Sequence, residues 1–289
     1  MIVVFGSINI DVLVPVAHLP VPGETVLGGD YIVAPGGKGA NQALAARRAG
    51  SEVAMVGAVG RDAFAEIGLS LLREGGVDLS LVATSTRPTG CATITIDALG
   101  ENQIAVSSGA NLAVTAAQVP DQLLGPGTVL VLQREVPITE NAALICRARE
   151  RGARIMLSLA PAGSIAPTQF DDIDILIANE NEAATLNSDI ADRLRRALVV
   201  TRGSAGAIAY LAGGASIEVP ALKIAPVDTT GAGDNFAGVL AAGLDQNLSL
   251  EMALRRASAA AALACLAVGA QPAMPDRTAI DEAVSRLQA

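Results

Sequence analysis

A glycine-rich turn that runs directly into an apolar segment carries the most informative acidic residue of this sequence. Residues 228–234 read DTTGAGD. Small residues at 231–233 let consecutive backbone N–H groups converge at a helix N-terminus, where unpaired amides and the helix dipole favour an anion. A carboxylate beside such a cradle can accept a proton from a hydroxyl group that attacks a bound phosphoryl group. The turn therefore predicts phosphoryl transfer with Asp234 as base, and the alternative is that Asp234 only caps the helix.

A second glycine turn, with the sequence APGGKGANQ at residues 34–42, also precedes an apolar segment. Lys38 and Asn41 of this turn offer donors to hydroxyl groups. Asn9 and Asp11 follow the first predicted strand, where the ligand crevice of an α/β sheet usually lies. Together with Asn41 they could bind several sugar hydroxyls, although as single residues Asn9 and Asp11 could equally form turns. The P-loop and the GxGxxG fingerprint are both absent from the sequence.

A further polar pair follows a predicted strand at 173–178. Asn179 and Glu182 lie one helical turn apart, so they could order Mg²⁺-bound water and phosphate. A zinc site is not expected, because His18 is the only histidine and the three cysteines lie far apart.

Apolar, β-branched segments alternate with helix-like segments along most of the chain. Strands are predicted at Ile2–Phe5, Val53–Val59, Val129–Leu132, 155–159, 173–178 and 198–201, and helices at 41–49, Ala63–Glu74, 139–151 and 180–186. This alternation of buried strands and helices predicts an α/β fold with a doubly wound, mostly parallel sheet. Beyond residue 207, a hairpin is expected at 208–211 and Ser216–Val219, and helices at 232–244, 250–268 and 277–287.

Two stretches, about 11–34 and 91–107, break this alternation. Both contain short alternating segments without a helical period, at 12–16, 25–27, 93–97 and 103–106. We interpret them as the strands of a small β-sheet that covers one mouth of the core as a lid. No linker or repeat interrupts the order, so a single domain over residues 1–289 is expected.

The composition excludes several classes of partner. With 51% hydrophobic and 17% charged residues, the chain is expected to be soluble with a large aliphatic core. A net charge of -9 argues against nucleic acid and anionic membranes as partners. The N-terminus lacks the pattern of a signal peptide, and no apolar run approaches the roughly 20 residues that cross a bilayer, so we expect a cytoplasmic protein.

Taken together, these segments resemble the ribokinase-like (pfkB) carbohydrate kinases over nearly the whole chain. The first family signature is matched by GSINID at 6–11, PGET at 22–25 and GGKGANQ at 36–42, and the second by residues 228–234. The resemblance implies an ATP-dependent sugar kinase with Asp234 as catalytic base and an anion hole formed by Gly231, Ala232 and Gly233. It also implies sugar-binding roles for Asn9, Asp11, Gly37, Lys38, Asn41 and Glu135.

Nucleotide and cation sites follow from the same resemblance. Mg²⁺ and phosphate are expected near Asn179 and Glu182. The nucleotide is expected along Thr201, Gly203, Ser204 and Gly206, with Ser258 bordering the adenine. A monovalent cation, K⁺, is expected mostly on backbone carbonyls at Asp228, Thr230, Ala264, Ala267, Gly269 and Ala273.

Four departures from the family pattern bear on these sites. Ala273 stands where many members carry a hydroxyl residue, which leaves activation by K⁺ open. Residues 158–162 read SLAPA in place of NPAPA, and Ser258 stands where a member can have histidine, so the nucleotide preference is also open. The connection from 179 to 199 is shorter than the family pattern, which predicts a trimmed helix beside the nucleotide.

The predicted acceptor is the primary hydroxyl of a small sugar. D-Ribose, giving ribose 5-phosphate, comes first because residues 90–92, 100–102 and 109–111 resemble lid segments of the family. Deoxyribose, a ketohexose and a ribonucleoside are alternatives. A catalytically silent sugar-binding regulator and a Rossmann oxidoreductase are further alternatives, and the missing GxGxxG counts against the oxidoreductase. A homodimer through the exposed lid strands is expected.

Overall fold

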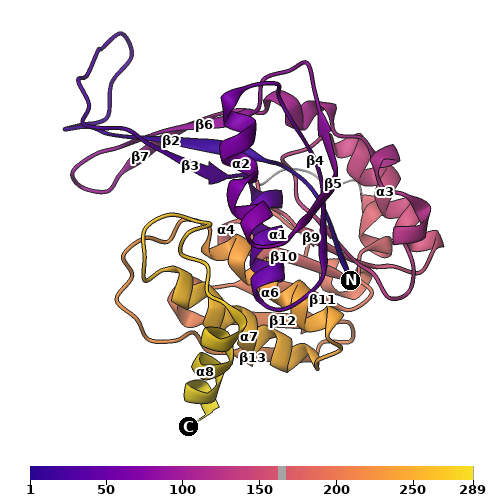
Figure 1. Cartoon of the computed structure of the whole chain (residues 1–289). Helices are drawn as coiled ribbons and strands as arrows, with labels where there is room; N and C mark the ends of the chain where they lie inside the picture. Colours follow the sequence, from indigo (N-terminus) through magenta and orange to yellow (C-terminus); the bar gives the residue numbers. More distant parts are fainter. Residues whose placement is uncertain (162–166, 289) are drawn as a thin grey trace.

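The computed structural model describes residues 1–161 and 167–288, and its described part contains two β-sheets (Figure 1). The larger sheet has nine strands in the order β13-β12-β11-β10-β9-β8-β1-β4-β5. These strands are β1 (Ile2–Phe5), β4 (Val53–Val59), β5 (Asp78–Thr84), β8 (Val129–Leu132), β9 (Arg154–Ser158), β10 (Ile175–Asn179), β11 (Ala197–Thr201), β12 (Ala207–Leu211) and β13 (Ser216–Val219). The strands from β5 to β11 pair in parallel, and β12 and β13 add an antiparallel hairpin at one edge. The predicted mostly parallel sheet is confirmed.

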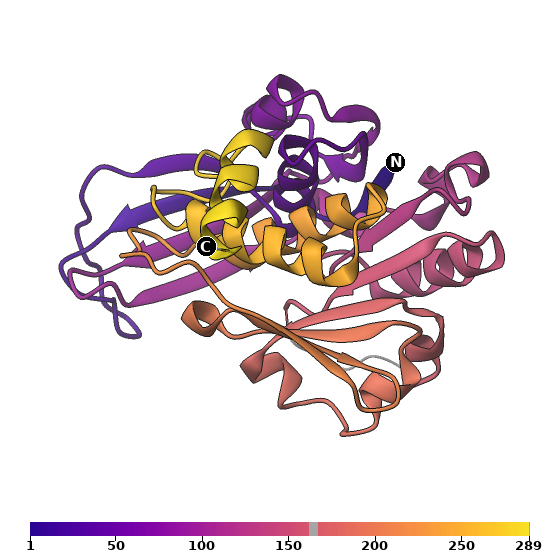
Figure 2. The same ribbon diagram turned by 90° about the horizontal axis from the view of Figure 1, so that it is seen from below.

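Both faces of the larger sheet are buried because successive residues of its strands point in opposite directions. In β1, Ile2 and Val4 belong to one hydrophobic cluster, and Val3 and Phe5 belong to another. The first cluster is covered by α1 (Lys38–Arg48), α2 (Ala63–Glu74), α6 (Ala232–Asp245), α7 (Leu250–Ala264) and α8 (Arg277–Gln288), and the second by α3 (Ile138–Glu150), α5 (Ile190–Arg193) and 3₁₀ turns. Figure 2 shows the C-terminal helices, in orange and yellow, together on one side of the strands.

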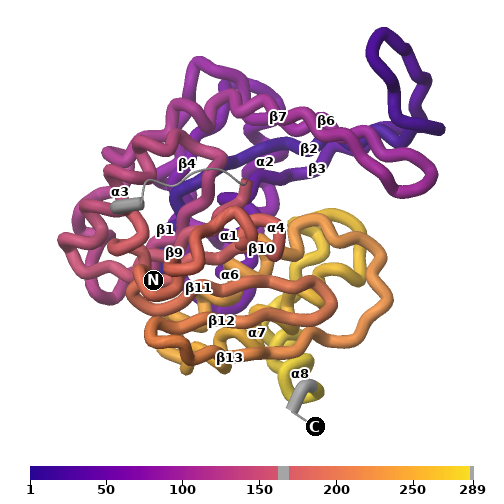
Figure 3. Tube along the Cα trace, turned by 180° about the vertical axis from the view of Figure 1, so that it is seen from behind, coloured from indigo at the N-terminus to yellow at the C-terminus, as the bar shows by residue number. Residues whose placement is uncertain are grey.

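The smaller sheet projects from the main body as an arm, as Figures 1 and 3 both show. Its order is β3-β2-β6-β7, formed by β2 (Asn9–Pro15), β3 (Ile32–Gly36), β6 (Gly90–Ile96) and β7 (Asn102–Ser107). β2 and β6 run parallel, whereas both outer pairs are antiparallel. The outer strands expose apolar side chains, with Ile32, Ile104 and Val106 each more than half exposed. The predicted small sheet therefore exists, and it begins two residues earlier than expected.

One predicted strand is absent, and two observed strands, β3 and β5, have no counterpart in the prediction. The strand expected at 25–27 is wrong, since this segment is irregular and only the following Gly28 forms an isolated bridge to Val16. The partner of β2 is instead β3, whose sequence IVAPG lacks clear alternation. The edge strand β5 was not predicted, because the sequence DLSLVAT is only partly buried and has no continuous apolar run.

Two helix predictions were too long. The helix expected at 250–268 ends at Ala264, where the N–H groups of Cys265 and Leu266 bond three residues back and tighten the last turn. The helix expected at 180–186 is the single turn α4 (Glu180–Ala183), and the single turn α5 follows it. The short connection thus holds two isolated turns. No helix within the described residues is both long and apolar enough to span a bilayer.

Helices α1 and α6 lie in close contact because Gly238 presents no side chain to α1. A Cβ atom on Gly238 would lie 2.4 Å from the carbonyl oxygen of Gln42 and 2.7 Å from the Cβ of Ala45. Alanines line the same stretch of α6, with Ala237 and Ala241 fully buried. This approach brings the N-termini of the two helices together at the carboxyl edge of the sheet, where both glycine turns lie.

We predict that Gly238→Ala destabilises the protein by about 1–2 kcal/mol in urea unfolding. Overpacking costs about 1–3 kcal/mol, and the better helix propensity of Ala returns up to about 1 kcal/mol. Gly127→Ala is the control, because a Cβ there would meet no atom within 4 Å. Equal stability of wild type and Gly238→Ala would show that α1 does not need this close approach.

Candidate active site

The carboxyl ends of four parallel strands of the larger sheet, β1, β8, β10 and β11, place predicted site residues at the same end of the sheet. Asn9 comes just after β1 and Glu135 just after β8. Asn179 is the last residue of β10 and Thr201 the last residue of β11. Because α1 and α6 also begin at this edge, both glycine turns lie beside these strand ends.

The Asp234 carboxylate is buried at the centre of this region, with 8% of the residue exposed. Its two oxygens accept hydrogen bonds from the side-chain amides of Asn41 and Gln42, each at 3.0 Å. Burial raises the pKa of Asp234, whereas the Lys38 charge and the two amide bonds oppose that rise. A carboxylate with a raised pKa is a stronger proton acceptor than an exposed aspartate, which suits a general base.

Four carboxylates lie around Lys38. The charge of Asp234, followed by those of Glu135, Glu182 and Asp11, raises the pKa of Lys38 in spite of its burial. The pKa of Asp11 is also raised, to about 6, because burial and the neighbouring charges of Glu135 and Asp234 disfavour its ionised form. Ionised carboxylates only accept hydrogen bonds, so Asp11 and Glu135 suit a ligand rich in hydroxyl groups.

Glu135 and Asn9 are each held by a residue that the sequence analysis did not select. The Ser7 hydroxyl donates to Glu135 Oε2 at 2.5 Å, and the backbone N–H of Lys38 donates to the same oxygen at 3.1 Å. Asn111 Nδ2 donates to Asn9 Oδ1 at 2.6 Å. The only available signal was position, since Ser7 and Asn111 both lie within segments that resemble the family.

The Gly231 turn begins α6 in a left-handed conformation, with φ of 74°, which favours glycine. The N–H of Ala232 donates to the Thr229 carbonyl at 3.2 Å. Within the described residues, the N–H groups of Gly231 and Gly233 donate to no backbone carbonyl in the turn. The N–H groups of Gly231 and Gly233 at the start of the helix can therefore offer an anion cradle, which stays a prediction, whereas the N–H of Ala232 is already paired.

A cavity of about 490 Å³ opens on the other side of this turn. It is lined by five residues of the predicted nucleotide set, namely Thr201, Gly203, Ser204, Gly206 and Ser258, and by Ala232 and Gly233 of the turn. A volume of this size is typical of small-molecule sites. Apolar walls come from Phe236, Leu222 and Ile224, which suits a flat aromatic ring. Ser258 donates its hydroxyl to the Pro220 carbonyl at 2.8 Å.

Asn179 and Glu182 cap α4 reciprocally. Asn179 Oδ1 accepts from the N–H of Glu182 at 2.8 Å, and Glu182 Oε2 accepts from the N–H of Asn179 at 2.9 Å. A magnesium ion on a nucleotide usually keeps several waters and takes one or two carboxylates. This pair offers a single carboxylate, and one of its oxygens is already used in the cap, so the pair fits Mg²⁺ only in part. Glu182 has a second oxygen for such water, and its charge reaches Lys38.

The carboxylate of Asp228 contacts two of the other predicted cation positions, Thr230 and Gly269. Its two oxygens accept from the N–H groups of Thr230 and Gly269, at 2.9 and 2.8 Å. These bonds lower the pKa of Asp228 although burial raises it. Among the described residues, the loop carbonyls of Asp228, Thr230, Ala267, Gly269 and Ala273 accept no hydrogen bond outside the helices. Free carbonyl oxygens fit a hard monovalent cation, with Ala264 at the end of α7 beside them.

Residues 158–161 lead from the end of β9 past the segment that carries Glu135. The Ala160 carbonyl accepts from the N–H of Arg134, the residue before Glu135, at 3.1 Å. Ala162, the last residue of the SLAPA segment, lies outside the described residues.

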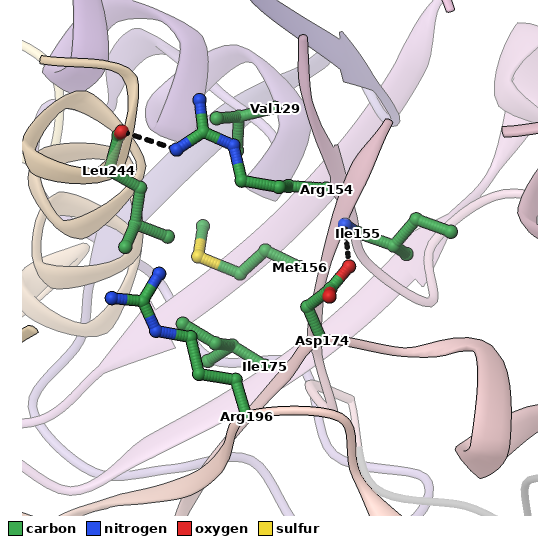
Figure 4. Close-up of a pocket in the computed structure, with 8 residues that line it drawn as sticks. All are labelled: Val129, Arg154, Ile155, Met156, Asp174, Ile175, Arg196 and Leu244. Atoms are coloured by element: carbon green, nitrogen blue, oxygen red, sulfur yellow. Dashed lines mark hydrogen bonds between the residues drawn. The ribbon is translucent and has the colours of Figure 1, made fainter. Parts of the chain in front are cut away.

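A separate small cavity lies at the opposite, amino-terminal edge of the strands (Figure 4). Arg154 and Arg196 flank it, and Arg154 Nη1 donates to the Leu244 carbonyl at 2.6 Å. A cation near the last turn of α6 is favoured by the helix dipole. The Arg154 bond therefore connects β9 to the far end of α6. The cavity is lined by none of the predicted site residues.

Known proteins match this chain over nearly its whole length. A family model described as pfkB family carbohydrate kinase matches residues 1–277. A ribokinase of Lactococcus lactis is 36% identical over 293 residues, covering 99% of this chain and 97% of that protein. The solved structure of an Arabidopsis thaliana ribokinase complexed with ribose and ATP has a TM-score of 0.88 and 31% identity, covering 98% of each chain. The predicted ribokinase-like fold is confirmed.

A kinase named for another sugar is also similar to this chain. A deoxyribokinase of Salmonella typhi is 30% identical over 302 residues, covering 98% of both proteins.

The raised pKa of Asp11 predicts a pH-dependent gain in stability for Asp11→Asn. A folded-state pKa of about 6, above the ordinary 3.8, means that ionisation of Asp11 weakens the folded state as pH rises through this range. In urea unfolding without ligand, the variant should exceed wild type by about 1–3 kcal/mol at pH 8 and match it near pH 4. Asp30→Asn, in an exposed loop, is the control. A difference that does not change with pH would contradict the assignment.

Proposed function

The chain belongs to the pfkB family of carbohydrate kinases, and from this premise we propose that it transfers the γ-phosphoryl group of ATP to a small sugar. The acceptor is the primary hydroxyl group, and D-ribose is the first substrate, giving ribose 5-phosphate. The observation that carries the proposal is the position of the buried Asp234 carboxylate. It lies within the charge cluster of Lys38, Asp11 and Glu135, and it directly follows the Gly231–Gly233 turn, whose residues Ala232 and Gly233 line a nucleotide-sized cavity.

The sugar side would bind hydroxyl groups through Asn9, Asp11, Gly37, Asn41 and Glu135. Their acceptors and amides are already oriented by contacts such as the Ser7 bond to Glu135. Such preorganisation holds the attacking oxygen close to the phosphorus and lowers the entropic part of the barrier.

The reaction would proceed at the N-terminus of α6. The sugar O–H bond breaks as the new O–P bond forms, the proton goes to Asp234, and the bond between the γ-phosphorus and the bridging oxygen breaks to leave ADP. The N–H groups of Gly231 and Gly233, with Lys38, stabilise the charge on the transferred group. Mg²⁺ held near Glu182 through water would supply further positive charge to the phosphates. K⁺ bound at the Asp228 carbonyl cluster would keep the turn in shape.

The arm formed by β2, β3, β6 and β7 is proposed to close over the sugar. It carries Asn9 and Asp11 on β2, so its movement would bring sugar-binding groups together and exclude water. Its exposed Ile32, Ile104 and Val106 support the proposal of a homodimer through the same strands. The whole chain, residues 1–289, would then act as one kinase domain with this lid. The expected cytoplasmic location stays a prediction.

Deoxyribose is the second candidate substrate, favoured by the similarity to the Salmonella typhi deoxyribokinase. The family assignment leaves the oxidoreductase alternative without support. A silent sugar-binding regulator would bind sugar and release no ADP.

We predict that Asp234→Asn lowers kcat for ribose by about 10²–10⁴-fold, the usual contribution of a general base. The measurement is coupled ADP release with ribose, deoxyribose, ketohexoses and nucleosides. Asp245→Asn, at the far end of the same helix, is the matched control and should keep wild-type kcat. Ribose should give the highest kcat/KM of the panel.

Two outcomes would contradict this proposal. Near-normal turnover of folded Asp234→Asn would remove the base. Sugar binding by wild type without ADP release from any substrate would favour the regulator.

A further inference from the structure

Two buried glutamines are linked to the Asp234 carboxylate by hydrogen bonds, Gln42 directly and Gln271 through Asn41. Gln42 Nε2 donates to Asp234 Oδ1 at 3.0 Å. Gln271 Nε2 donates to Asn41 Oδ1 at 3.1 Å, and Asn41 Nδ2 donates to Asp234 Oδ2 at 3.0 Å. Both glutamines are fully buried. The chain of bonds therefore runs from Gln271 through Asn41 to the carboxylate.

We infer that Gln42 and Gln271 are positioning residues for the base, and that Gln271 acts by fixing the orientation of the Asn41 amide. This inference rests on the proposed function, and it adds residues that neither sugar nor nucleotide needs to touch.

The direction of the chain is set by the carboxylate. An ionised carboxylate only accepts, so Asn41 must present its NH₂ group to Asp234 and its carbonyl oxygen away from it. The Gln271 NH₂ group meets that oxygen. If Asn41 turned over, an amide oxygen would face a carboxylate oxygen and an NH₂ group would face another NH₂ group. Gln271 therefore holds Asn41 in the one orientation that stabilises the ionised base.

The orientations of the two glutamines carry a cost in folding free energy. Within the described residues, the carbonyl oxygens Gln42 Oε1 and Gln271 Oε1 are buried without a hydrogen-bond partner. Leaving buried acceptors unpaired is destabilising. Selection for stability alone would favour apolar side chains at such positions, whereas support of a buried base requires the two NH₂ groups.

The backbone around Gln271 is anchored well enough to give its side chain a fixed position. Arg48 Nη1 donates to the carbonyl oxygens of Gln271 and Met274, both at 2.8 Å. Ala270 packs on the catalytic turn, since a Cβ on Gly231 would lie 2.6 Å from the Ala270 Cβ. The segment thus contacts both the last turn of α1 and the turn before α6.

The charged groups around Asp234 come from three other places, and all remain in the variants below. They are Lys38 on α1, Glu135 after β8 and Asp11 on β2. Residues 269–275 bring no charged side chain. A change in the titration of the base caused by residue 271 would therefore act through the amide chain.

The test is the pH profile of kcat/KM for the best sugar, whose acidic limb reports the base in the free enzyme. Gln42→Met should move this limb to higher pH by about one unit, a tenfold change in proton affinity. Gln271→Met should lower kcat by about three- to tenfold and move the limb in the same direction by about half a unit. If Gln271→Met does not fold, Gln271→Asn replaces it in this test. Its side chain is too short to reach Asn41, so the same changes in kcat and in the acidic limb are expected.

The matched control is Gln246→Met. Gln246 joins the same two helices at their other ends, where its Nε2 donates to the Ala49 carbonyl at 3.1 Å. This variant should lose stability and leave the acidic limb unchanged.

A double-mutant cycle tests whether Gln271 acts through Asn41. In an Asn41→Ala background, Gln271→Met should have less than a twofold further effect on kcat. Equal fold-losses with and without Asn41, or an unmoved acidic limb in folded Gln42→Met and Gln271→Met, would overturn the inference.

Failure of the proposed function would be visible separately, as a wild type that phosphorylates no sugar. The inference is then tested without substrate, by titrating the carboxyl carbon of Asp234 in ¹³C NMR. That signal is identified by its loss in Asp234→Asn. The pH midpoint of this signal should rise relative to wild type in Gln42→Met and Gln271→Met, and it should stay unchanged in Gln246→Met. Equal midpoints in the three variants would refute the inference.

Discussion

Burial of one carboxylate at the N-terminus of α6 is the constraint on which the rest of the site depends. Removal from water makes Asp234 a better proton acceptor, and it also makes the ionised form costly unless donors surround it. The donors Lys38, Asn41 and Gln42 all come from the first two turns of α1. The two helices must therefore begin side by side, which the glycine and alanines of α6 permit.

The order of the strands places the proposed sugar and nucleotide sites on either side of this carboxylate. β1 and β8 lie in the middle of the sheet and end beside the proposed sugar-binding residues, whereas β11 ends at Thr201, in the lining of the proposed nucleotide cavity. The turn before α6 lies between the two sides. Asp11 belongs to the smaller sheet, and its raised pKa shows that this sheet reaches the same electrostatic environment. A movement of the arm would thus change the surroundings of the base.

Much of this fold could be predicted from the sequence, because strands buried on both faces are continuous apolar runs. β5 and β3 were missed for the opposite reason: β5 is a half-exposed edge strand, and β3 contains Pro35 and ends at Gly36. Family resemblance, rather than physical reasoning, supplied Glu135 and the nucleotide residues Thr201, Gly203, Ser204, Gly206 and Ser258, whereas Asn179 and Glu182 followed from their position after a strand. Gln271 could not be predicted, because its bond to Asn41 spans 230 positions of sequence.

The most direct test of the central claim is a crystal structure with ribose and a non-hydrolysable ATP analogue. The account predicts the primary hydroxyl of the sugar within about 3 Å of an Asp234 carboxylate oxygen, the reach of a hydrogen bond. The terminal phosphate should lie at the same distance from the N–H of Gly233. A terminal phosphate bound elsewhere, or a sugar hydroxyl directed away from Asp234, would contradict the account.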